Sequence, residues 1–120
     1  MKTVSTLGEY NVEYIPDNWV VLRIEHEGQT YHKVLAGWTG SYTSGDSWRM
    51  NSGITKVVEE PLHWLFHGVS GSVYRCNKDR YGLRHNCGGV YDQLKQRYGD
   101  AVTMLDDLSD FSSIELVDTK

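Results

Sequence analysis

The segment Trp19–Trp38 constrains the fold of this chain most strongly. Its first part, WVVLRIEH, places Val20, Leu22 and Ile24 on one face and polar or aromatic side chains on the other. The letters EGQ around Gly28 then form a short connection, and TYHKVLAGW alternates again. A period of two is typical of half-buried strands, and a short Gly-containing connection joins antiparallel neighbours. The segment therefore predicts a β-hairpin.

The rest of the chain up to Cys76 adds further strand patterns. Alternation predicts one strand over Ser47–Val58, in which Gly53 indicates a bulge or a close backbone approach. Two more strands are predicted at Leu62–His67 and Ser72–Cys76, and two short ones nearer the ends of the chain, at Tyr10–Ile15 and Ala101–Leu105.

One convincing helix follows these strands. Val90, Leu94 and Tyr98 recur every four residues, and Gly99 ends the pattern. We therefore expect a β-rich α+β domain, with a curved antiparallel sheet of about five strands. This half-barrel-like meander would pack one C-terminal helix, near residues 88–98, on one face. The expected core residues are Leu22, Ile24, Val34, Trp48, Ile54, Trp64, Phe66, Val73 and Leu94.

Length and charge divide the chain into a body and a tail. A chain of 120 residues fits one domain, which we place at residues 1–105. Residues 100–120 hold six carboxylates against one lysine, a net charge of −5. We expect residues 106–120 to form an acidic, mobile tail, although Ile114, Leu116 and Val117 could dock. The start of the chain lacks an apolar signal segment and no run is long enough to span a membrane, which predicts a soluble, intracellular protein.

Glycine and serine at two bends suggest a binding surface. Ser70-Gly71-Ser72 and Ser52-Gly53 can present backbone N–H groups and hydroxyls to a small anion. The alternative is that these residues only serve tight turns. Arginines and a tyrosine near the bends could grip phosphate or carboxylate. The expected ligand-binding residues are Arg49, Asn51, Ser52, Gly53, Ser70, Gly71, Ser72, Tyr74, Arg75 and Arg84.

The stretch Arg75–Arg97 carries six basic and two acidic side chains, interleaved with tyrosines. Such a mixture could bind a nucleotide or single-stranded nucleic acid, or it could be a solvated charged face. The overall pI of about 5.7 argues against a protein dedicated to long duplex DNA.

Metal binding and catalysis find little support. Cys76, His85 and Cys87, with His63 or His67, lack the spacing of a zinc site, and we expect free thiols. A cysteine or serine nucleophile beside a histidine can be drawn, but no local motif supports one. The sequence thus predicts no metal, no cofactor and no catalytic residue, and it favours a binding protein over an enzyme.

The segments GWTGSYTSGDSWRMNSGI and FHGVSGSVYRCNKDRYGLR resemble small uncharacterised accessory proteins of tailed bacteriophages. The resemblance covers Asn18–Tyr98 and carries no activity that can be transferred. It implies an accessory protein in the cytoplasm of an infected bacterial host, where such proteins often act in counter-defence. The implied mode is either binding of a protein or sequestration of a small nucleotide signal, and our first hypothesis is sequestration of a small anionic or nucleotide ligand.

A second hypothesis is a protein–protein inhibitor or structural component that binds a host or phage protein. Trp19, Trp38 and Tyr42 would then be exposed anchors, because interfaces favour Trp, Tyr and Arg. A homo-oligomer is compatible with either hypothesis, and neither involves a membrane.

Overall fold

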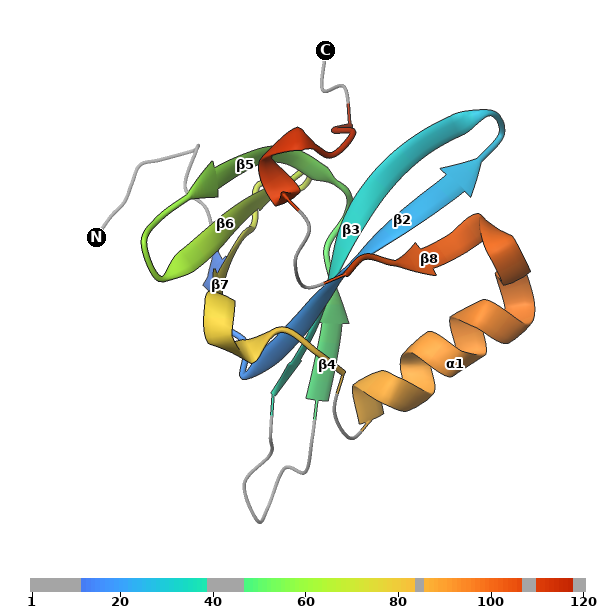
Figure 1. The fold of residues 1–120 in the computed structure, drawn as a ribbon, viewed down its shortest axis with the longest axis horizontal. Coiled ribbons are helices and arrows are strands. Elements are labelled where there is room, and N and C mark those ends of the chain that lie inside the picture. Colours follow the sequence, from blue (N-terminus) through green and yellow to red (C-terminus); the bar gives the residue numbers. More distant parts are fainter. Residues whose placement is uncertain (1–11, 39–46, 84–85, 107–109, 118–120) are drawn as a thin grey trace.

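The computed structural model describes residues 12–38, 47–83, 86–106 and 110–117, and they form two four-stranded sheets and one α-helix (Figure 1). Sheet A has the order β1-β7-β6-β5, and sheet B has the order β4-β3-β2-β8. The strands are β1 Glu13–Tyr14, β2 Asn18–His26, β3 Gln29–Trp38, β4 Ser47–Met50, β5 Ile54–Glu59, β6 His63–Gly68, β7 Val73–Asn77 and β8 Val102–Met104. The helices are α1 Asn86–Tyr98 and three 3₁₀ turns, η1 Lys78–Arg80, η2 Gly99–Ala101 and η3 Phe111–Ser113.

The β2–β3 hairpin is the centre of the molecule. Its register runs from Asn18 opposite Gly37 to His26 opposite Gln29. The two-residue connection has positive φ at both positions, 52° at Glu27 and 79° at Gly28. Such a turn matches the twist of the flanking strands. The predicted hairpin is confirmed.

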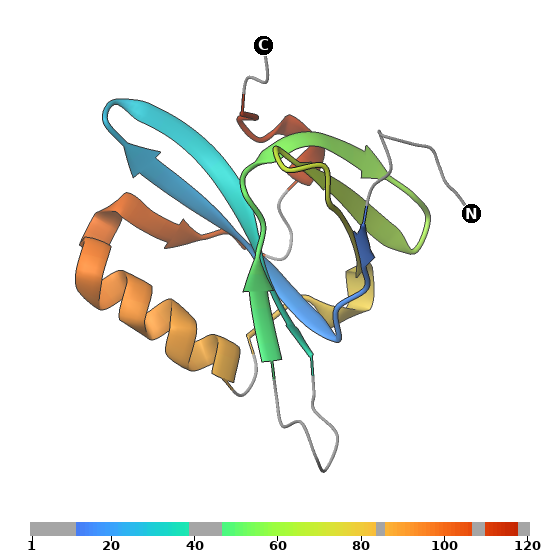
Figure 2. The same ribbon diagram turned by 180° about the vertical axis from the view of Figure 1, so that it is seen from behind.

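Both faces of this hairpin are buried along residues 18–22 and 34–37. In both views α1 lies on one side of it and β5, β6 and β7 lie on the other (Figure 1, Figure 2). Side chains between the two sheets form one core cluster, and those between sheet B and α1 form a second. The continuous apolar run WVVL supplies both clusters in alternation. The first cluster is Trp19, Val21, Val34, Ala36, Ile54, Trp64, Phe66, Tyr74, Cys76 and Phe111, and the second is Val20, Leu22, Leu35 and Val102.

The single strand predicted over Ser47–Val58 is wrong. The chain leaves β4 at Met50 and enters β5 at Ile54, so the two halves belong to different sheets. Gly53 lies between them with φ at 129°, a conformation that side chains rarely adopt. The β-rich character is confirmed, but there are two sheets where we expected one curved sheet.

Most expected core residues are buried, and Trp48 is the main exception. Its exposed fraction is 46%, because it lies on the edge strand β4 opposite Gly37, which offers no side chain to pack against. Ile24 and Leu94 are half-buried beside the second cluster. The expected core residues that are buried are Leu22, Val34, Ile54, Trp64, Phe66 and Val73.

Residues 110–117 lie where the sequence suggested a mobile tail, and in the structure they pack against the body. Phe111 is 2% exposed, with its ring 5.6 Å from that of Trp19 and 5.4 Å from that of Trp64. Ile114 packs against the same cluster. An aromatic anchor thus holds this segment to the core between the sheets.

Helix α1 begins before the predicted Val90 and ends where expected. Gly99 follows it with φ at 59°, the left-handed conformation that commonly ends a helix. Over the part of the chain that the structure describes, no helix has the length and apolar character needed to cross a membrane.

Candidate functional site

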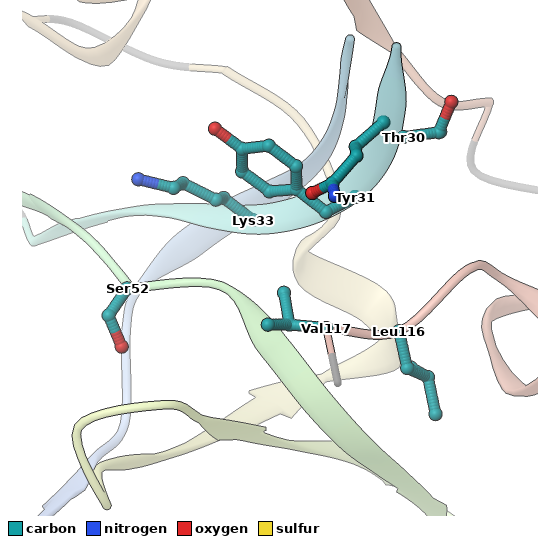
Figure 3. A pocket seen from close by; sticks show the side chains of 7 residues that line it. Thr30, Tyr31, Lys33, Ser52, Leu116 and Val117 are labelled. Atoms are coloured by element: carbon teal, nitrogen blue, oxygen red, sulfur yellow. The ribbon is translucent and has the colours of Figure 1, made fainter. Parts of the chain in front are cut away.

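A groove of about 600 Å³ lies between the free end of the β2–β3 hairpin and the C-terminal segment. Figure 3 shows Tyr31 and Lys33 extending from β3, with Ser52, Leu116 and Val117 on the other side of the groove. We call it the hairpin groove. Its lining residues are Gln29, Thr30, Tyr31, Lys33, Ser52, Leu116 and Val117.

The groove exists because β4 covers only part of β3. The β4 register ends with Met50 opposite Leu35. The next residue, Asn51, donates its N–H to the Val34 carbonyl at 3.1 Å and accepts the Val34 N–H on Oδ1 at 2.9 Å. Residues 29–33 therefore have no paired strand on this side within the described chain, and the groove runs along them.

The polar lining of the groove suits a small anion. Lys33 makes no ion pair with any described residue, so its ammonium is available to a ligand. Thr30, Tyr31 and Ser52 add hydroxyl groups, and Gln29 adds an amide. A cation surrounded by neutral donors can bind phosphate or carboxylate by charge-assisted hydrogen bonds.

The C-terminal segment forms the apolar wall of the groove and is fixed at three points. Val117 donates its N–H to the Ile54 carbonyl at 2.8 Å. His32 Nδ1 donates to the Glu115 carbonyl at 2.9 Å, since a carbonyl can only accept. At Gly53 a Cβ would lie 2.9 Å from Val117 Cγ2, so the wall approaches the backbone closely there. The close backbone approach that the sequence predicted at Gly53 is present.

The structure brings together five of the sequence-predicted site residues at one corner. Ser52 Oγ accepts the Ser70 N–H at 2.9 Å, and the Gly53 carbonyl accepts the Val69 N–H at 3.0 Å. Gly71 has φ at 95°, as expected for a tight bend. We call this the serine corner: Ser52, Gly53, Ser70, Gly71 and Ser72.

Two backbone donors of the serine corner, the amides of Ser70 and Gly71, are engaged inside the protein, as are those of the neighbouring residues Gly68 and Val69. Besides the amides of Val69 and Ser70, Gly68 donates to the Ser72 carbonyl at 2.9 Å and Gly71 donates to the Gly68 carbonyl at 3.0 Å. The next strand continues this pattern, because Val73 donates to Val12 at 2.8 Å. An anion at this bend would have to displace these bonds, so the geometry favours a turn.

Arg75 is compensated by two carboxylates. Its Nε donates to Glu13 at 2.9 Å and a terminal nitrogen donates to Glu60 at 2.7 Å. The hydrogen bond and charge of Glu13, followed by those of Glu60, raise the pKa of Arg75. We expected a free anion-binding arginine, but this side chain ties β1 and β7 to the segment after β5.

Of the other predicted site residues, Tyr74 and Arg49 both contact Tyr14, away from the serine corner. Tyr74 is buried between the sheets, and burial raises its pKa to about 12. Its ring lies 5.1 Å from Tyr14, and the guanidinium of Arg49 lies 4.6 Å from the same Tyr14 ring. Asn51 is 4% exposed, and its side chain accepts the N–H of Val34 in β3. Arg84 lies outside the described residues.

Sequence reasoning missed most of the groove. Of its lining residues only Ser52 was predicted to bind a ligand. The groove joins segments more than 80 residues apart in the chain, and no local motif marks such a contact. A lysine facing outward from an apolar strand, as Lys33 does, is the one available signal.

Two expected interface anchors are placed differently. Trp19 is 1% exposed, with its indole N–H donated to the Asn77 carbonyl at 2.7 Å, so it is a core residue. Trp38 is half-buried, and its indole N–H binds the Ile15 carbonyl at 2.9 Å. Tyr42 lies outside the described residues.

Within the described ranges we find no site for metal binding or for thiol chemistry. No group of three or more His, Cys, Asp or Glu side chains there could hold an ion. Cys76 is buried, and burial raises the pKa of its thiol well above the ordinary range. His85 and the Cys87 side chain belong to the part that is not described. Comparisons with protein-family models, with curated proteins and with solved structures each found no match.

Proposed function

We propose that this protein is a non-enzymatic binding protein that sequesters a small anionic ligand in the hairpin groove. The observation that carries the proposal is that Lys33, which makes no ion pair with a described residue, lines the same groove as the hydroxyl-bearing residues Thr30, Tyr31 and Ser52. Arg75, one of the arginines expected from the sequence to bind the ligand, is already compensated by two carboxylates. The proposal therefore keeps the ligand class expected from the sequence and changes the residues that bind it.

The dimensions of the groove agree with this ligand class. About 600 Å³ is within the usual range of small-molecule sites. A nucleotide or a similar phosphate-bearing metabolite has enough oxygens to engage Lys33 and the hydroxyl of Tyr31 together. Because the resemblance of the sequence is to phage accessory proteins, we further propose that sequestration serves counter-defence in the cytoplasm of an infected bacterium.

The test is a binding series with two lysine variants. Inorganic phosphate and a panel of mononucleotides and cyclic nucleotides are titrated by calorimetry into the wild type, Lys33→Gln and Lys56→Gln. Lys56 is an exposed lysine of β5 that does not line the groove, which makes it a matched control. Loss of a charge-assisted hydrogen bond should weaken binding about 10- to 100-fold in Lys33→Gln.

Three results would overturn the proposal. They are the absence of binding to any member of the panel, equal weakening in the two lysine variants, and conversion of the ligand to products during incubation. Mass spectrometry of the recovered ligand distinguishes an intact ligand from turnover.

One observation favours a second function, that of a protein–protein inhibitor. Trp48 is 46% exposed on the edge strand β4, next to Arg49, which makes no ion pair with a described residue. Exposed Trp and Arg side chains are frequent interface hot spots. In this case Trp48→Ala would abolish retention of a partner in a pull-down from host lysate, whereas Lys33→Gln would leave retention unchanged.

A further inference from the structure

A second hollow adjoins the hairpin groove on the α1 side of sheet B. It measures about 300 Å³, and Tyr31 and Lys33 line both hollows. We call it the helix pocket. Its remaining lining is mostly apolar: Ile24, Met50, Leu94, Tyr98, Ala101 and Val102, with Glu25 and His26 beside them.

The helix pocket exists because α1 supplies few apolar side chains. Of the α1 side chains that the structure describes, Val90, Tyr91 and Leu94 pack against the second core cluster. Met50 is left half-buried, and Tyr98 at the end of the helix is 52% exposed. Apolar surface thus stays accessible between the hairpin and the last turn of α1, where a ligand could cover it.

In the described lining of the helix pocket, the titratable residues Glu25 and His26 have partners of opposite charge. Glu25 is paired with Arg23, and His26 Nε2 lies 3.6 Å from the carboxylate of Glu27. Lys95 donates to the Val102 carbonyl at 2.7 Å. Lys33 therefore provides the unpaired charge of the described lining, at the point where the apolar pocket meets the polar groove.

We infer that the ligand is amphipathic, with its anionic head at Lys33 in the hairpin groove and an apolar body in the helix pocket. This inference rests on the proposed function and names the class of its ligand. Burial of apolar surface would add affinity that the ammonium of the half-buried Lys33 alone could not supply, since one charge near water attracts an anion weakly.

The inference predicts how affinity depends on chain length. Each methylene group removed from water contributes a factor of about four in the dissociation constant. Butyl, hexyl and octyl phosphate, titrated below their aggregation concentrations, should therefore bind progressively tighter than inorganic phosphate. The head group is the same in the three alkyl phosphates. The slope of the logarithm of the dissociation constant against chain length therefore reports the apolar contact alone.

Two variants locate the head and the body. Lys33→Gln should weaken all the alkyl phosphates by a similar factor and leave the slope unchanged. Ala101→Leu places a larger side chain in the helix pocket and should flatten the slope at octyl phosphate, with inorganic phosphate binding unaffected. Ala101→Ser is the matched control and should keep the slope of the wild type.

The outcomes separate this inference from the proposed function. Binding of inorganic phosphate that depends on Lys33, with the same affinity for all chain lengths, would overturn the inference and leave the proposed function standing. Absence of any anion binding would overturn both. If 1-octanol bound as tightly as octyl phosphate, the assignment of the head group to Lys33 would be overturned.

Discussion

Asn51 closes the edge of β3 at Val34 through a pair of hydrogen bonds, with its Oδ1 accepting the Val34 N–H at 2.9 Å and its own N–H donated to the Val34 carbonyl at 3.1 Å. One residue thus satisfies both main-chain groups that a strand would otherwise pair. The chain can then leave sheet B for sheet A immediately after Asn51. The edge of β3 beyond Val34 is left to the hairpin groove.

Asn51→Ala should lower the free energy of unfolding by about 1–3 kcal/mol, because the buried Val34 N–H loses its acceptor. Urea denaturation followed by tryptophan fluorescence measures this change. Ser52→Ala removes an acceptor from the Ser70 N–H, which is exposed and can bind water instead, and should cost less. Equal losses in the two variants would contradict the role given to Asn51.

Phe111→Ala should lower the free energy of unfolding by about 3–5 kcal/mol, the usual cost of truncating a buried aromatic ring. The reason is its contact with Trp19 and Trp64 in the core between the sheets. Leu116→Ala, at an exposed position of the same segment, should change the free energy by about 0.5 kcal/mol or less. Wild-type stability in Phe111→Ala would show that the C-terminal segment does not belong to the core.

Stability should decrease as the pH falls below about 6.5. Burial lowers the pKa of His32 from its ordinary value of 6.5, and burial followed by the charge of Lys56 lowers the pKa of His67. Below pH 6.5 the unfolded chain therefore binds more protons than the folded one, until the pH passes the folded pKa. Each histidine adds at most about 1.4 kcal/mol per pH unit to the slope of the free energy of unfolding against pH.

Denaturation curves between pH 7.5 and 5 for three variants separate these contributions. His32→Gln and His67→Gln should each make the pH dependence shallower, and His26→Gln, at an exposed position, should not. A slope that persists unchanged in His32→Gln would contradict the account of its burial under the C-terminal segment.

Arg75→Ala should reduce the melting temperature at low salt and leave ligand affinity unchanged. The structure gives Arg75 two carboxylate partners, Glu13 and Glu60, and no place in the hairpin groove. Because salt screens exposed ion pairs, the loss of stability should shrink at high ionic strength. Weakened ligand binding at an unchanged melting temperature would instead indicate that the ligand binds at the serine corner.

The sequence predicted the parts of the fold that depend on local pattern. The hairpin was visible because its alternation and its turn at Gly28 lie within one segment. The division of Ser47–Val58 between two sheets was not visible, because it depends on the pairing of Asn51 with Val34, 17 residues away. The alternation of apolar and polar residues is the same whether the chain continues as one strand or passes from one sheet to the other.

For the candidate site, local sequence pattern predicts even less than it does for the fold. Ser52 was predicted from its neighbouring glycine, whereas Lys33 and Val117 meet only through the tertiary fold. The sequence does not show that Arg75 is paired, because its partners, Glu13 and Glu60, lie 62 and 15 residues away in the chain. Composition at a bend indicates what a turn can bind but gives no information on which donors the fold has already engaged.

The most direct test of the hairpin groove is an NMR titration of ¹⁵N-labelled protein with octyl phosphate. The account predicts amide shifts at Lys33, Ser52 and Val117 of the groove and at Leu94 and Ala101 of the helix pocket. At the same ligand concentration, both sets of shifts should be much smaller in Lys33→Gln. Shifts confined to Ser70–Arg75, with the groove amides unmoved, would contradict it.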